Sequence, residues 1–273
     1  MPNATERART ARIVQSRHNA RVKELRRAFA QPGRGERGLV AIEGELLLGE
    51  AVRSGLAVKT VFVRSGSEAV LERVAVEAGE VLELPTDVFA SAVETESPQG
   101  VAALVGVPRF GLEEIFPERG AALVLVLAGL QDPGNVGTLI RSAEAFGASG
   151  AVLLPGTVNV WNAKAVRASA GSVFRLPVVS LGLEEMTLEL RKRGVRLLAT
   201  AADGDVALGA AGLEGPVAVG IGNEGAGVPA EVLAAADARV AIRCPGPVES
   251  LNAGIAGSIL LYEAARQRAG AGR

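Results

Sequence analysis

Short apolar runs alternate with amphipathic segments along most of the chain. In the first third, β-branched runs predict strands, and apolar positions at helical spacing predict helices. We expect helices at 20–30, 45–54, 68–78 and 87–93, and strands at 39–43, 60–64, 81–84 and 101–107. This alternation is typical of an α/β unit, here with mainly parallel strands.

A second α/β series begins at residue 123. Its first strand, 123–128, is almost wholly apolar, as expected for a central strand covered on both faces. A helix from Val136 to about Phe146 follows, because its apolar positions form one stripe. Segment 108–120 carries two prolines and two glycines, which predicts a linker. Further strands are expected at 151–154, 195–200, 216–221 and 239–242, and helices at 163–169, 183–193 and 251–266.

Composition narrows the class of protein. The 273 residues make roughly two domains of about 100–200 residues each, and 48 % hydrophobic residues supply ample core. The longest apolar run is about ten residues, short of the roughly 18 that span a bilayer. No apolar segment follows the charged N-terminus, so we expect a cytoplasmic protein. A single cysteine, Cys244, and a single histidine, His18, exclude disulfides, cysteine-built zinc clusters and histidine-centred catalysis, and we expect no metal.

Charge is unevenly distributed along the chain. Residues 1–37 carry ten Lys or Arg against three Glu, a surplus of seven positive charges, whereas the remainder carries a deficit of eight. A basic arm on an otherwise acidic chain suggests contact with a phosphate backbone. A solvated terminus with no partner explains the same charges, so charge alone leaves both interpretations open.

Three turns follow predicted strands and could carry chemistry. In the first, Asn135 sits where a helix N-cap belongs, and Arg141 falls off the apolar stripe of the next helix. The second, 220–227, matches the dinucleotide-binding pattern G-x-G-x-x-G, but only a short helix follows it. Its glycines indicate a close approach of the backbone to another group, and it contains Glu224.

The third turn runs from residue 242 to 252 and is rich in proline and glycine. It enters the last helix at Ser250, a candidate N-cap, and Asn252 follows. Because the carboxyl ends of parallel strands meet at one edge of a sheet, all three turns should gather there. The side chains expected to converge are Asn135, Arg141, Glu224, Ser250 and Asn252.

Together these turns resemble the SpoU/TrmH family of RNA ribose 2′-O-methyltransferases. The resemblance rests on three ordered motifs: Asp-Pro-x-Asn-x-Gly-x-x-x-Arg at 132–141, Gly-x-Glu-Gly-x-Gly at 222–227 and Glu-Ser-Leu-Asn at 249–252. Segment 164–171 also looks like the family's Arg-x-Ser-x-Gly stretch. In the N-terminal part, residues 19–23 and the Glu-Gly pair at 43–44 look like a ribosomal-protein-like RNA-binding domain.

The resemblance implies an α/β fold with a trefoil-knotted methyltransferase domain and a smaller N-terminal α/β RNA-binding domain. A knot is outside the usual topology rules, so periodicity could not show it. The family also implies a homodimer paired through the knotted domain. The expected divisions are a basic arm at 1–18, an RNA substrate-binding domain at 19–107, a linker at 108–120 and the methyltransferase domain at 121–268.

The resemblance also implies a cofactor and roles for the site residues. S-adenosylmethionine would be held by Gly222, Ile242 and Leu251, largely through backbone groups. The five converging side chains would surround the ribose and the transferring methyl group. The sequence departs from the family at 243–244, where Arg-Cys replaces the usual Pro-Met, and at 253–254, where Ala-Gly replaces the commoner Val-Ser.

The expected reaction transfers a methyl group to a ribose 2′-OH, with ribosomal RNA preferred as target and transfer RNA left open. The family proposal makes Arg141 the general base. Because arginine keeps its proton at physiological pH, Arg141 could equally orient a phosphate and stabilise alkoxide charge.

Three other functions compete with this one. An NADP-dependent oxidoreductase could use 220–225 with Arg243, but this leaves the first and third motifs unexplained. A non-catalytic RNA-binding or ribosome-assembly factor could rely on the basic arm alone. Methylation of a pyrimidine carbon would need Cys244 as nucleophile, and that residue has no base beside it in the sequence.

Overall fold

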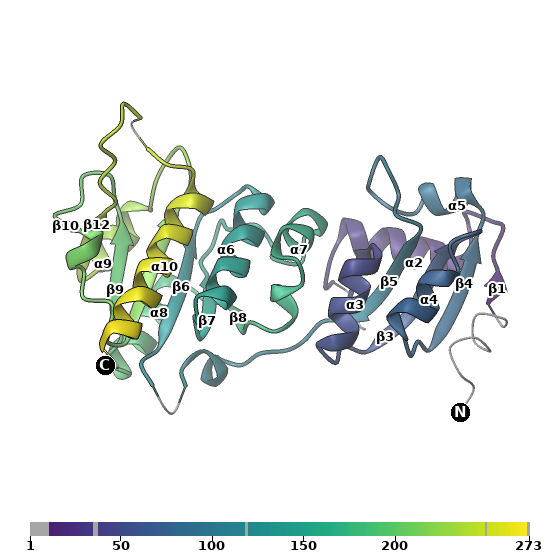
Figure 1. Ribbon diagram of the computed structural model, residues 1–273, viewed down its shortest axis with the longest axis horizontal. Helices are drawn as coiled ribbons and strands as arrows, with labels where there is room; N and C mark the ends of the chain where they lie inside the picture. The colour runs from purple at the N-terminus through teal and green to yellow at the C-terminus, as the bar shows by residue number, and fades with distance from the viewer. Residues whose placement is uncertain (1–10, 35–37, 118–119, 249, 272–273) are drawn as a thin grey trace. The chain divides into compact units, whose positions relative to one another are not determined.

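The computed structural model describes residues 11–34, 38–117, 120–248 and 250–271 (Figure 1). These form two compact units. Unit 1 comprises the residues up to Arg109 together with Trp161–Phe174, and unit 2 comprises Phe110–Val160 and the residues from Arg175 onward. Most of the predicted basic arm, residues 1–10, and Glu249 of the third motif lie outside the described residues.

Unit 1 contains a mixed five-stranded sheet in the order β1-β4-β3-β5-β2. β1, β4 and β3 are parallel neighbours, whereas β5 runs antiparallel to both β3 and β2. β2 therefore runs in the same direction as β1, β3 and β4, so the prediction of mainly parallel strands is confirmed for the described strands of this unit, with β5 as the reversed strand. Alternation of helices and strands does not determine strand direction, since the connection after β4 is long enough to bring the chain back either way. The strands are β1 (Arg12–Ile13), β2 (Leu39–Glu43), β3 (Val58–Arg64), β4 (Glu80–Leu84) and β5 (Val101–Gly106).

The helices of unit 1 bury their apolar sides in one core. Val22, Leu25 and Phe29 of the first helix pack in the same cluster as Phe62 of β3. Ala163 of α7 belongs to this cluster too, although α7 lies within the sequence range predicted for the methyltransferase domain. The helices are α2 (Ala20–Ala30), α3 (Glu45–Arg53), α4 (Ala69–Val74), α5 (Thr86–Ala90), α7 (Ala163–Ser169) and the 3-10 turn η2 (Ser172–Phe174).

Unit 2 contains a seven-stranded sheet in the order β10-β12-β9-β11-β6-β7-β8, with every pair parallel. Its strands are β6 (Leu123–Ala128), β7 (Gly150–Leu153), β8 (Val178–Ser180), β9 (Arg196–Thr200), β10 (Val206–Ala207), β11 (Val217–Gly222) and β12 (Ala238–Ala241). Its helices are η1 (Leu112–Ile115), α6 (Pro133–Ala145), α8 (Leu183–Lys192), η3 (Leu208–Ala210), α9 (Ala230–Ala235) and α10 (Ala253–Ala271).

Helices cover both faces of this sheet. Val124 and Val126 of β6 share a core cluster with Met186 of α8 and Val232 of α9. α6 and α10 pack together, as Figure 1 shows. β6 is buried along its whole length. Because successive side chains of a strand point to opposite faces, both faces of the sheet are covered at β6. This confirms the prediction of a central strand covered on both sides.

The start of α6 differs from the prediction. The helix begins at Pro133, and its N-cap is Asp132, whose Oδ1 accepts hydrogen bonds from the backbone N–H groups of Gly134 and Asn135. Asn135 is therefore inside the first turn, and its assignment as N-cap was wrong. Proline suits the first helical position, because its missing N–H would have no partner there.

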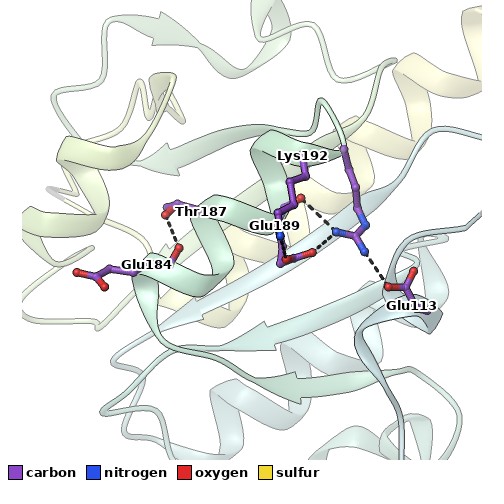
Figure 2. A network of polar contacts seen from close by, with 6 residues as sticks. Glu113, Glu184, Thr187, Glu189 and Lys192 are labelled. Atoms are coloured by element: carbon purple, nitrogen blue, oxygen red, sulfur yellow. Dashed lines mark hydrogen bonds and ion pairs between the residues drawn. The ribbon is translucent and has the colours of Figure 1, made fainter.

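Part of the predicted linker is attached to unit 2 (Figure 2). Arg193, after α8, donates to Glu189 and, at 2.9 Å, to Glu113 of η1, and its guanidinium lies 4.6 Å from the centre of the Phe116 ring. Ile115 is fully buried. Hydrogen bonds lower the pKa of Glu189, the one from Lys192 more than the one from Arg193. Residues 112–116 are thus held by both apolar contacts and ion pairs.

Candidate active site

A cavity of about 510 Å3 opens at the carboxyl ends of β9, β11 and β12 in unit 2. β7 and β8 follow β6 in order on one side of it in the sheet. The chain then crosses to β9 on the other side of β6, and β11 lies between β9 and β6. Open α/β sheets bind ligands at this kind of topological switch. The volume lies within the roughly 300–1,000 Å3 of small-molecule sites. Its walls include residues from 200–203, 221–228 and 242–244.

The glycine-rich loop after β11 is closed on itself. Asn223 and Gly227 exchange two backbone hydrogen bonds of 2.9 Å, and the Asn223 side chain accepts bonds from the N–H groups of Gly225 and Ala226. A Cβ on Gly222 would collide with the backbone of Gly227. Glycine is thus required at 222 by the close approach of the loop. The following helix, α9, has only six residues, which argues against a dinucleotide-binding unit.

The three residues predicted to hold the cofactor all line this cavity. Gly222 ends β11, Ile242 follows β12 and Leu251 precedes α10. Residues from three segments therefore surround one space. Its volume fits an adenosyl cofactor.

Four of the predicted catalytic side chains gather at the same place. Glu224 and Ser250 line the cavity, and the Asn135 side-chain amide donates to Glu224. A Cβ on Gly254 would lie 3.0 Å from Asn135 Oδ1 and 3.1 Å from Asn252 Oδ1, so both amides converge on this glycine. The first and third motifs therefore meet beside the second.

The start of α10 also differs from the prediction. The helix begins at Ala253, and Asn252 acts as its cap, with Oδ1 accepting from the N–H of Ile255 at 3.2 Å. The assignment of Ser250 as N-cap was wrong, because the helix begins two residues later than the sequence suggests.

Arg141 is the predicted residue that the structure does not bring to the cavity. It lies exposed on α6 and is not among the cavity's lining residues. Conversely, Thr200 and Asp203 line the cavity and were missed by the sequence analysis. The available signal was their position, since Thr200 ends a predicted strand and Asp203 follows it, at the same sheet edge.

Comparisons with known proteins agree with this architecture. The family model described as "SpoU rRNA Methylase family" matches residues 122–262, more than half of the chain. A second model, "MRM3-like substrate binding domain", matches residues 19–103. None of the helices in the described parts of the chain has the length and apolar character needed to cross a membrane.

Relatives match over nearly their whole length. The 23S rRNA (guanosine(2553)-2′-O)-methyltransferase RlmP of Bacillus subtilis is 34 % identical over 250 residues, covering 91 % of this chain and 97 % of the relative. The SpoU methyltransferase AviRb of Streptomyces viridochromogenes, solved with AdoMet, has a TM-score of 0.82 and 30 % identity, covering 92 % of this chain and 99 % of AviRb. The AdoMet-bound rRNA methyltransferase of Sinorhizobium meliloti has a TM-score of 0.81 and 32 % identity, covering 94 % and 98 %. The chain therefore belongs to the SpoU rRNA methylase family.

Proposed function

We propose that this S-adenosylmethionine-dependent RNA 2′-O-methyltransferase acts on ribosomal RNA, with residues 19–107 binding the substrate and 121–268 carrying out the transfer. The observation that carries the proposal is the meeting of the three motif segments at one place: the second and third line the cavity, and the first reaches it through the hydrogen bond from Asn135 to Glu224. The choice of ribosomal RNA is supported by relatives whose names specify it and which match both parts of this chain. We propose the cytoplasm as its compartment, because a ribosomal RNA target of this kind is found there.

S-adenosylmethionine, when bound, supplies a methyl group on a positively charged sulfur. Gly222 and Ile242, at the ends of β11 and β12, and Leu251, before α10, would hold this molecule, largely through main-chain groups. The Asn135–Glu224 hydrogen bond holds two polar groups of the first and second motifs in one orientation. A site that holds the two reactants themselves in position can lower a barrier by up to roughly 7–11 kcal/mol. Asn252 is held by its capping bond and presents its amide beside Asn135.

The ribose hydroxyl must lose a proton as its oxygen is methylated. Two roles for Arg141 are consistent with its chemistry: general base, as the family proposal has it, or a fixed cation that orients a phosphate and stabilises negative charge on the 2′-oxygen. An Arg141→Lys variant with nearly full activity would contradict both roles, since a planar bidentate group would then be unnecessary.

We also propose that two copies pair through α10. Its exposed side carries Ile255, Ile259 and Tyr262, which are 53 %, 38 % and 56 % exposed. Spacings of four and three residues place them on one helix face. An Ile259→Asp variant should therefore sediment as a monomer. Leu188→Asp, a change at a more exposed leucine on α8, should leave the dimer intact; a monomeric wild-type protein would contradict the pairing.

The target is tested by supplying purified ribosomal RNA and transfer RNA, each unmodified, together with labelled S-adenosylmethionine. We expect label in ribosomal RNA with the wild-type protein and at least a ten-fold lower rate with Glu224→Gln, which weakens the bond to Asn135. Glu231→Gln, at an exposed position on α9, is the matched control. Label in transfer RNA alone would overturn the proposed target, and equal rates for both variants would overturn the site.

A further inference from the structure

Arg243 directly follows Ile242 after β12, it is exposed, and it lines the cavity described above. It is the only cation among the lining residues within the described chain, whereas Asp203 and Glu224 line the same cavity as carboxylates. Its guanidinium adds a positive charge and five N–H donors to this wall.

The guanidinium of Arg243 is not neutralised by its surroundings. Within the described residues, no carboxylate lies within ion-pair distance of it, and no hydrogen bond to it is formed. The two residues of this loop that most restrict its backbone, Pro245 and Pro247, lack an N–H group. The Arg243 side chain is the charged donor that residues 242–248 offer to a ligand.

An unpaired guanidinium at the wall of a ligand cavity fits an oxyanion. Carboxylate and phosphate groups match its planar fork, and the bond is strengthened by opposite charge. Asp203 and Glu224 repel an anion from their own parts of the wall, which favours its location at Arg243. We infer that Arg243 binds an oxyanion of a ligand in this cavity: the carboxylate of the cofactor or a phosphate of the RNA. The identity of these two ligands rests on the proposed function.

Binding measurements separate the two sources. S-adenosylhomocysteine keeps the cofactor's carboxylate, whereas 5′-methylthioadenosine lacks it. If the anion is the carboxylate, Arg243→Gln weakens binding of S-adenosylhomocysteine by about ten-fold and leaves that of 5′-methylthioadenosine unchanged. If it is a phosphate, both nucleosides bind as before, RNA binds about ten-fold more weakly, and the slope of log affinity against log salt falls by about one.

A matched control is available on the same strand. Arg239 is exposed on β12 but does not line the cavity, so Arg239→Gln should change none of these affinities. Arg243→Lys, which keeps the charge, should recover part of the binding. Unchanged affinity for every probe with Arg243→Gln would overturn the inference, as would an equal loss for both nucleosides. Failure of the wild-type protein to bind S-adenosylhomocysteine would instead contradict the proposed function.

Discussion

Replacing Gly222 with alanine should disable the cofactor cavity. The added Cβ would overlap the carbonyl carbon and oxygen of Gly227 and the nitrogen of Val228, well inside the 3.4 Å at which ordinary van der Waals contact begins. These atoms are backbone, so no side-chain rotation can relieve the overlap. The loop 223–227 must move as a whole, and it is closed by its own hydrogen bonds.

The size of the effect follows from the cost of overpacking. Inserting a methyl group into a tightly packed place costs about 1–3 kcal/mol. If the overlap is relieved only when the loop 223–227 moves away from the position it has beside the bound cofactor, the free energy of cofactor binding becomes less favourable by this cost. At about 1.4 kcal/mol per factor of ten, the affinity for S-adenosylhomocysteine should fall by roughly 5- to 150-fold.

Calorimetric titration with S-adenosylhomocysteine checks this directly, with thermal unfolding measured alongside. Gly225→Ala is the control, because a Cβ there meets only Asn223 Oδ1 at 3.6 Å within the same loop. The affinity of that variant for S-adenosylhomocysteine should lie within about two-fold of the wild-type value, a difference well below 1.4 kcal/mol, which is about the free energy of a tenfold change. Equal affinity for the Gly222→Ala variant and the wild type would refute the reasoning that close backbone approach shapes this cavity.

Two further predictions concern stability. Arg268 donates to the carbonyls of four residues at 2.7–2.9 Å. Arg268→Ala should therefore lower the free energy of unfolding, measured in urea, by about 2–4 kcal/mol. Arg266 donates to Glu263 alone, so a loss no larger than that of Arg266→Ala would contradict this prediction. Hydrogen bonds from Arg266 and Gln267 lower the pKa of Glu263 to about 2. Because the unfolded value is about 4.3, the carboxylate stabilises the fold above that pH and loses this effect as the pH falls toward 2. The stability difference between wild type and Glu263→Gln should shrink over that window, and a difference independent of pH would rule out the ion pair as its source.

Local periodicity was sufficient for the elements with strong patterns. The boundaries of α2, β2, β6 and α7 agree with the sequence predictions residue for residue. The short strands β1, β8 and β10 were missed, because two or three residues cannot display a period. The direction of β5 and the packing of α7 with unit 1 depend on contacts between distant parts of the chain, which no local pattern encodes.

The candidate site was partly predictable for a geometric reason. Turns that follow parallel strands share one edge of the sheet, and this brings Asn135, Glu224 and Asn252 together as expected. The same rule, applied to the end of β9, would have included Asp203. Arg141 was placed by its motif and by its position on the helix, but it is the ninth residue of α6, in the third turn, and so lies farther from the strand ends than Asn135 in the first turn.

The central claim is the transfer of a methyl group to a ribose oxygen. The most direct test is to incubate the protein with S-adenosylmethionine and unmodified ribosomal RNA, digest the RNA to nucleosides, and locate the added mass by tandem mass spectrometry. We predict a nucleoside whose extra 14 mass units, roughly one methyl replacing a hydrogen, stay with the ribose fragment, as expected for an attack by the 2′-oxygen oriented in this site. A methyl group found on the base fragment would contradict the account.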